Sequence, residues 1–356
     1  MLNKFNWCYF SDCNLNDEFF DSLKEDYEEF PEWFDRKSKE HTKAFVYKEN
    51  NSIKAFVYLK REHDEALELT DRILPQEPRI KIGTLKISDN SQGMRLGEGA
   101  IGVSLWYWQK SNYNQIYITV FEKNIKLISI LLQFGFECVG QNKRGENIYI
   151  KDKRNLSFED CYKSFPYISS DIERCGYIPI NDTYHDTLFP YSELYGTNQE
   201  TEEIAAANGI TKIFLAAPSS DLDYKPNDPV LIYRKHTGDG IAKYKSVVSS
   251  FCTVNKQIII KKNNKCFITK EEFLKLVGNK TVFSLEELNE WYDKKNLVII
   301  ILVYNGYFGK GKNINYATLK ENGLFENYPY VNKLTKSQFK KVLEMGGKNV
   351  QNIIIN

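Results

Sequence analysis

The segment "SQGMRLGEGAIG", residues 91–102, lies between a strand-like run and a helix-like run. The preceding "RIKIGTLKIS" (79–88) alternates and is β-branched, which favours a strand, and "EGAIGVSLWYWQKSN" (98–112) favours a helix. A strand that passes through glycines into a helix presents backbone N–H groups at the positive end of the helix dipole. The segment therefore predicts an anion site, and pyrophosphate is the obvious ligand. The GK[ST] of a P-loop is absent.

The surrounding sequence predicts a mixed arrangement of helices and strands that closes near residue 152. Ahead of the glycine turn we expect two short helices in 16–40, capped by Asn16 or Asp17 and broken at Pro31. Two strand-like runs joined by "NN" (50–51) predict a hairpin. Beyond the first helix-like run we expect a strand at 115–121, a helix at 123–134 and a strand at 146–152.

The stretch "MRLGEG" (94–99) resembles the [Q/R]-x-x-G-x-[G/A] pyrophosphate turn of the GNAT-type N-acetyltransferases. The order of the neighbouring motifs adds to the resemblance: "GTLKIS" before the turn, then "VFEKN", then "LLQFGF". The resemblance covers roughly residues 1–152 and implies acetyl-CoA as the acyl donor. The alternative is that Gly97 and Gly99 only permit close packing of the helix.

By this resemblance, backbone N–H groups of the turn hold the pyrophosphate, the backbone of the preceding strand runs beside the pantetheine, and an Asn contacts the CoA arm. The corresponding cofactor-binding residues are Leu85, Lys86, Ile87, Arg95, Leu96, Gly97, Glu98, Gly99, Ala100 and Asn124. The sequence departs from the family pattern at two places. Met94 stands where Gln or Arg is usual, and Leu131 stands where many members place a Tyr that protonates the departing thiolate.

Acetyl transfer to an amine requires a group that accepts a proton, and the sequence offers two weak catalytic candidates. His63 follows a strand that faces the expected cleft, and its pKa class suits proton transfer, but it could equally be a solvated loop residue. Glu122 follows the strand at 115–121, or it only favours the start of the next helix electrostatically. His185 and Asp186 are adjacent, and neighbouring residues rarely form a His–carboxylate relay, so this pair could be structural.

The second half of the chain predicts a small β-barrel with added helices, including a fully buried strand at 297–304 and a capping box at Thr269 and Glu272. It resembles the central strands of PUA-like (ASCH/EVE-type) barrels by strand order and by an aromatic-basic pattern. From Arg234 to Lys270 there are nine Lys or Arg residues and one acidic residue, Asp239. Such a surface could bind nucleic acid, or it could be a solvated basic face. The nucleic-acid candidates are Arg234, Lys235, Lys243, Tyr244 and Lys245.

The predicted fold class is therefore α+β: a GNAT-like mixed sheet flanked by helices at 1–152, a structured linker at 153–208, and a PUA-like barrel at 209–356. Seven scattered cysteines without a CxxC pair argue against a disulfide framework or a metal site and favour a reduced, cytoplasmic location. No signal-peptide-like or membrane-spanning run is seen, so no membrane partner is expected. Oligomeric state is left open.

The function expected is acetyl-CoA-dependent N-acyl transfer, in which the PUA-like domain selects or tethers the acceptor, RNA or an RNA-associated protein being the first to test. One alternative is a protein or small-amine acetyltransferase with no nucleic-acid role. Another is a non-catalytic protein that binds CoA, a modified nucleotide, or both.

Overall fold

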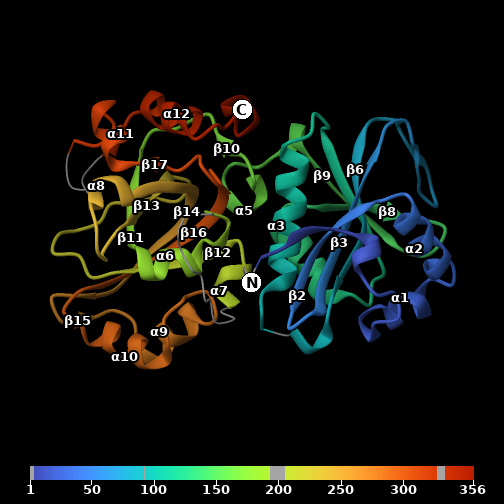
Figure 1. The fold of residues 1–356 in the computed structure, drawn as a ribbon, viewed down its shortest axis with the longest axis horizontal. Coiled ribbons are helices and arrows are strands. Elements are labelled where there is room, and N and C mark those ends of the chain that lie inside the picture. The colour runs from blue at the N-terminus through green and yellow to red at the C-terminus, as the bar shows by residue number, and fades with distance from the viewer. Residues whose placement is uncertain (1–3, 92, 193–204, 327–332) are drawn as a thin grey trace. The chain divides into compact units, whose positions relative to one another are not determined.

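The computed structural model describes residues 4–91, 93–192, 205–326 and 333–356, and the chain divides into two compact units. The first unit ends at Leu156, and the second begins at Ser157. Both combine mixed sheets with flanking helices, so the fold is α+β as the sequence predicts (Figure 1).

The sheet of the first unit has seven strands in the order β1-β2-β3-β6-β7-β9-β8. Helix α3 packs against β3, β6 and β7, and Figure 1 shows α1 and α2 on the other side of the sheet. The elements are β1 (Asn6–Tyr9), α1 (Asp21–Asp26), α2 (Phe30–Lys39), β2 (Lys43–Glu49), β3 (Ser52–Glu62), β4 (Leu67–Glu68), β5 (Ile73–Leu74), β6 (Arg79–Ile87), α3 (Leu96–Gln109), β7 (Gln115–Val120), α4 (Ile125–Gln133), β8 (Glu137–Gln141) and β9 (Asn147–Asp152).

Local sequence explains the first elements of this unit. The side chain of Asp17 accepts a hydrogen bond from Phe19 N, which caps the turn before α1. Asn50 and Asn51 both have positive φ, which matches the twist of a two-residue hairpin turn and confirms the predicted β2–β3 hairpin. Pro31 does not break a helix: it lies in the first turn of α2, where its missing N–H has no intrahelical partner to lose. Phe10, Phe20 and Phe34 pack on Phe56 and Tyr58 of β3 to form the core under α2.

The sheet of the second unit has eight strands, six of them in the order β12-β16-β14-β13-β11-β18, with β15 and β17 paired to β14. Strands β10 and β19 form a separate two-stranded parallel sheet. The elements are α5 (Cys161–Ser164), β10 (Ile168–Ser169), β11 (Cys175–Asn181), α6 (Asp182–Leu188), α7 (Ala205–Asn208), β12 (Thr211–Ala216), β13 (Pro229–Lys235), α8 (Ala242–Lys245), β14 (Val247–Lys262), β15 (Lys265–Cys266), α9 (Lys270–Val277), α10 (Leu285–Asp293), β16 (Leu297–Tyr307), β17 (Ile314–Asn315), α11 (Tyr316–Glu321), β18 (Lys333–Leu334), α12 (Lys336–Met345) and β19 (Ile354–Ile355).

The predicted small barrel is not closed: among the described strands no hydrogen-bonded pair joins the ends of the second sheet, β12 and β18. Strand β14 is 16 residues long and shifts register three times along β16, and each bulge adds local twist. The predicted buried strand is β16, and the predicted capping box at Thr269 is formed with Glu272. Residues 153–208, expected as a linker, include β11, which lies between β13 and β18 in this sheet.

Candidate functional site: the cleft between β6 and β7

A cleft opens in the first unit where two parallel strands diverge. Strands β6 and β7 pair over four residues, from Arg79–Gln115 to Ile82–Ile118, and β6 then continues to Ile87 without pairing to β7. The cleft has a volume of about 1440 Å³ and is lined by both strands beyond this last pair and by the first residues of α3 and α4. The register of β3 against β6 shifts here at Tyr58/Leu59, and a Cβ on Gly83 would lie 2.9 Å from Tyr58 Cδ1. Glycine therefore lets β6 approach β3 at the level where the cleft begins.

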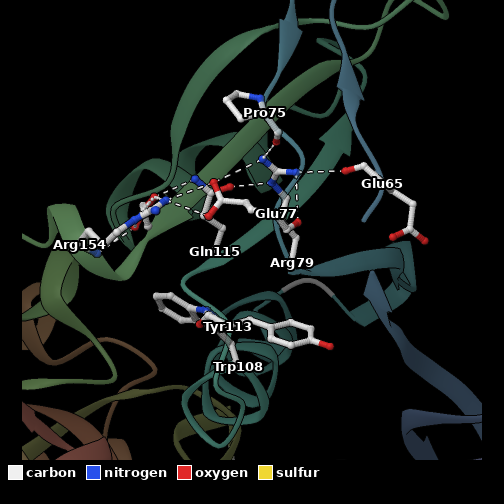
Figure 2. A network of polar contacts seen from close by, with 9 residues as sticks. Glu65, Pro75, Glu77, Arg79, Trp108, Tyr113, Gln115 and Arg154 are labelled. Atoms are coloured by element: carbon white, nitrogen blue, oxygen red, sulfur yellow. Dashed lines mark hydrogen bonds and ion pairs between the residues drawn. The ribbon is translucent and has the colours of Figure 1, made fainter. Parts of the chain in front are cut away.

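A buried arginine fixes the paired, closed end of the two strands (Figure 2). Arg79 is 1% exposed, and its Nε donates to Gln115 Oε1 of β7 at 2.6 Å. Its two other nitrogens donate to backbone carbonyls of Glu65 and Pro75 at 3.2 and 2.7 Å. Gln115 Nε2 in turn donates to Asp152 Oδ2 of β9 at 2.7 Å. The network joins β6, β7, β9 and the preceding loop at the end opposite the cleft.

The mouth of the cleft contains the start of α3. Arg95 precedes the helix with φ of 56°, in the left-handed region, and Gly99 N donates to Arg95 O at 3.1 Å. The Arg95 side chain is 7% exposed; Nη2 lies 2.5 Å from Glu98 Oε2, and Nη1 has no hydrogen-bond partner among the described residues. A buried guanidinium nitrogen without an acceptor is costly, so this geometry fits an anionic ligand at the mouth.

The structure brings most of the predicted cofactor-binding residues together. Eight of them line the cleft: Leu85, Lys86, Ile87, Arg95, Leu96, Gly97, Glu98 and Asn124. Gly99 and Ala100 are buried within α3 and are not among the lining residues. Gly97 also has a packing role, because a Cβ there would lie 3.0 Å from Ile130 Cδ1 of α4. Asn124 precedes α4 and makes no side-chain cap bond.

Neither predicted catalytic residue is among the residues that line the cleft. His63 is exposed, and its Nδ1 lies 2.9 Å from the hydroxyl of Tyr113, in the loop at the closed end of the strands. Glu122 is exposed and points to solvent between two lining residues, Phe121 and Lys123. Leu131, where many family members have Tyr, is fully buried.

Two buried carboxylates that sequence reasoning missed do line the cleft. Glu62 and Glu146 are each 5% exposed, and each accepts a hydrogen bond from a tyrosine. Tyr117 OH donates to Glu62 Oε2 at 2.6 Å, and Tyr27 OH donates to Glu146 Oε1 at 2.8 Å. Burial, then the hydrogen bond to the carboxylate, raise the pKa of both tyrosines, so both remain protonated donors. The only sequence signal for Glu62 is its place in an alternating strand, which the charged run "KREHDE" conceals.

The turn between α1 and α2 crosses the cleft and is held on its far side by polar contacts. Lys123 Nζ lies 2.7 Å from Asp26, and Arg144 Nη1 lies 2.7 Å from Glu29. Tyr27, between these acids, makes the bond to Glu146 described above. We call residues 26–29 the strap. Its two ion pairs are largely exposed, so each contributes little to stability.

In the second unit the predicted nucleic-acid residues separate into two groups. Arg234 is buried and makes a bidentate ion pair with Asp186, at 2.7 and 2.8 Å, so this guanidinium is not offered to phosphate. The other four residues, Lys235, Lys243, Tyr244 and Lys245, are exposed. Lys243 Nζ lies 5.5 Å from the Tyr244 ring centroid, and Tyr244 is 56% exposed.

His185 and Asp186 do form a hydrogen-bonded pair, contrary to the expectation for adjacent residues. His185 Nδ1 lies 2.8 Å from Asp186 Oδ1, and Nε2 lies 2.6 Å from Ser249 Oγ. His185 and Ser249 are fully buried, and burial lowers the pKa of His185. The arrangement is a polar element of the core of the second sheet.

Within the described residues no group of three or more His, Cys, Asp or Glu side chains could hold a metal ion. Among the same residues, no helix has both the length and the apolar character needed to cross a bilayer.

No family model and no curated protein matches the sequence. Among solved structures, the chain is similar to ASCH from Zymomonas mobilis (12% identity, 48% of this chain and 94% of that chain, TM-score 0.30). It is also similar to the N-acetyltransferase PseH of Campylobacter jejuni, solved with acetyl coenzyme A (16% identity, 42% and 99%, TM-score 0.28). A third is an N-acetyltransferase from Staphylococcus aureus (15% identity, 34% and 76%, TM-score 0.26). At these scores the similarities carry no argument about function, which rests on the cleft.

Proposed function

We propose that the first unit is an acetyl-CoA-dependent N-acyltransferase of the GNAT type. The observation that carries the proposal is the cleft between the diverging ends of β6 and β7, with the N-terminus of α3 and the unpartnered Nη1 of Arg95 at its mouth. A helix N-terminus and a guanidinium together favour a pyrophosphate. The β6 residues Leu85 to Ile87 have no β7 partner, so their backbone is available to the pantetheine amides.

The donor would supply an activated acyl group, and the chain would hold and orient it. Arg95 to Glu98 would bind the pyrophosphate, and Asn124 would contact the CoA arm. Lys86 also lies in the cleft, where burial lowers its pKa and its Nζ contacts Ser22 Oγ.

Isothermal titration of the full chain with acetyl-CoA tests the donor assignment. We expect saturable binding, and we expect Arg95→Gln to weaken it about tenfold or more, because a charge-assisted hydrogen bond contributes roughly 1.5–3 kcal/mol. Arg61→Gln is the matched control, since Arg61 is exposed, lies outside the cleft lining and packs over the Tyr107 ring. No binding by the wild-type chain, or equal affinity of the Arg95 and Arg61 variants, would contradict the assignment.

For the second unit we propose that it selects or tethers the acceptor through the segment 235–245. The exposure of Lys235, Lys243, Tyr244 and Lys245 supports this, because phosphates favour the charges and an unpaired base can stack on the ring. RNA is the first acceptor to test, by measuring binding against salt concentration. A flat salt dependence would exclude phosphate contacts and leave a protein or small-amine acceptor.

The buried Leu131 supports a second candidate, a protein that binds CoA without catalysis, since no tyrosine stands there to protonate a thiolate. The two candidates differ in one measurement. Saturable acetyl-CoA binding without release of the free thiol in the presence of cell extract would favour the binding protein.

A further inference from the structure

One wall of the cleft carries two lysines that face each other across neighbouring strands. Lys60 of β3 is paired with Lys81 of β6, and residues paired in antiparallel strands project from the same face of the sheet. Both line the cleft, and Lys81 is one residue before Ile82, where β6 makes its last pair with β7. The next residue of β3, Arg61, lies 5.6 Å from the centroid of the Tyr107 ring of α3, so the two lysines lie on the face opposite α3.

Helix α2 covers that face and adds basic side chains to it. Phe34 of α2 and Tyr58 of β3 belong to one aromatic core, and Lys37 Nζ lies 5.9 Å from the centroid of the Tyr58 ring. Tyr58 is two residues from Lys60 in β3, so the two side chains point to the same face. We call the basic lining residues of this part of the cleft the basic wall; they are Arg36, Lys37, Lys60 and Lys81.

Lys81 differs from the rest of the basic wall in having no acidic partner. Arg36, Lys37 and Lys60 each have a carboxylate oxygen within 4.0 Å. The acids that supply these oxygens are Glu40, Glu62 and Glu65. Lys81 makes no ion pair or side-chain hydrogen bond with any residue that the structure describes, and its Nζ lies 5.6 Å from the centroid of the Tyr117 ring.

Two physical effects therefore favour an anion beside Lys81. Its side chain is half-buried, and an ammonium that is partly removed from water is costly without a counter-charge. Lys60 and Lys81 are also like charges placed directly opposite each other, an arrangement that destabilises a sheet. A bound phosphate or carboxylate would offset both costs.

We propose that the basic wall is the acceptor subsite of the cleft, and that the acceptor is an amine carrying a phosphate or carboxylate group that Lys81 and Lys60 bind. The proposal rests on the proposed acyl-CoA function. The amine nitrogen forms a C–N bond to the acyl carbon while the C–S bond breaks and leaves its electron pair on the CoA sulfur. The proton lost by the nitrogen reaches that sulfur through water. The anionic group takes no part in this exchange, and its binding fixes the position of the amine.

The donor and the acceptor would use different cations. Helix α3, which Arg95 precedes, packs against the face of the sheet opposite the basic wall. The pyrophosphate of CoA would bind at Arg95, and the anionic group of the acceptor at Lys81 and Lys60. The two anions therefore do not compete for one site, and the acceptor can bind while CoA is in place.

The test is isothermal titration of the full chain, saturated with CoA, with two matched pairs of amines. One pair is phosphoethanolamine and ethanolamine, and the other is 4-aminobutyrate and butylamine. We expect at least one anionic amine to bind about tenfold or more tighter than its neutral counterpart, because a hydrogen bond to a charged group contributes that much. The tighter of the two anionic amines identifies phosphate or carboxylate as the group recognised. Its affinity should also fall as salt is added.

Three variants separate recognition from structure. Lys81→Gln should weaken the anionic amine about tenfold or more and leave the neutral amine and CoA within twofold. Lys81→Arg keeps the charge and should recover part of that affinity. Lys39→Gln is the control, because it removes the same charge from an exposed residue of α2 that lies outside the cleft lining. It should bind both amines as wild type does.

The proposal is overturned if CoA binds but each anionic amine binds no tighter than its neutral counterpart, or not at all. It is also overturned if Lys81→Gln and Lys39→Gln have the same affinity for the anionic amine. A chain that does not bind CoA or acetyl-CoA would contradict the proposed function itself, and the titration with CoA that precedes each amine titration distinguishes the two failures.

Discussion

At the scale of single residues, Arg79 has the strongest consequence for stability. Its buried guanidinium satisfies Gln115 and two backbone carbonyls, all of which would be left without a donor in Arg79→Met. We expect this variant to lose about 3 kcal/mol or more of unfolding free energy in urea. Arg154→Met is the control in the same network (Figure 2): its side chain is 52% exposed, so the loss should be below about 1 kcal/mol. Similar losses for both variants would contradict this interpretation.

The buried pair His185–Asp186 predicts acid sensitivity. Burial lowers the pKa of His185, so its contribution is complete above the unfolded value of about 6.5 and is lost as pH falls below it. Burial opposes ionisation of Asp186, but hydrogen bonds from Arg234 and His185 prevail and lower its pKa to about 2. That second contribution is complete above about pH 4 and is lost toward pH 2.

The first window can be measured by urea unfolding between pH 8 and pH 5. Wild type should lose stability with a slope of up to about 1.4 kcal/mol per pH unit from this one proton. His185→Gln should have a shallower slope than wild type. Equal slopes in wild type and His185→Gln would show that His185 titrates alike in both states.

At the scale of elements, the sequence predicts best where interactions between neighbouring residues determine the secondary structure. The run 79–88 and the glycines after it appear as β6, Arg95 and α3, and the two asparagines at 50–51 form the hairpin turn. Residues around Pro179 looked like a linker because proline rarely occurs inside strands. In the structure β11 pairs with β18 only at Cys175 and Gly176, so Pro179 has a ladder partner on one side alone. The sheet tolerates Pro179 because β18, which is distant in the chain, does not pair with this residue. The residues around Pro179 therefore carry no signal of that pairing.

Gly83, where β6 packs closely against β3, gives a prediction about the position of the whole strand β6. In Gly83→Ala the new Cβ would lie 2.9 Å from the Tyr58 ring, which is itself packed among buried aromatic residues. We expect about 1–3 kcal/mol of destabilisation and weaker acetyl-CoA binding, since β6 must move away from β3. Gly238→Ala is the control, because its Cβ would come no closer than 3.4 Å to His236. Wild-type stability and affinity in Gly83→Ala would mean that Tyr58 moves without cost.

At the scale of the molecule, the strand–turn–helix side of the cleft was predictable, and the buried carboxylates in its lining were not. Apart from Asn124, the residues predicted to bind the cofactor lie within one strand–turn–helix stretch, so their spacing is visible in the sequence. The two carboxylate–tyrosine pairs combine Tyr27, Glu62, Tyr117 and Glu146 from four separate segments. Contacts across 55 and 119 residues have no spacing that a reader of the sequence could recognise.

The division into two compact units predicts that residues 3–156 fold without the rest of the chain. This segment contains its complete seven-stranded sheet and an aromatic core of its own around Phe10, Phe20 and Phe56. At about 150 residues a segment buries enough surface for independent stability. We expect the fragment to unfold cooperatively in urea and to bind acetyl-CoA within a few-fold of the full chain, because every lining residue of the cleft lies within it. The Arg95→Gln fragment serves as the binding control. A fragment that lacks a cooperative transition would mean that the second unit is needed to complete the first, whereas a folded fragment without affinity would remove the cleft as the donor site.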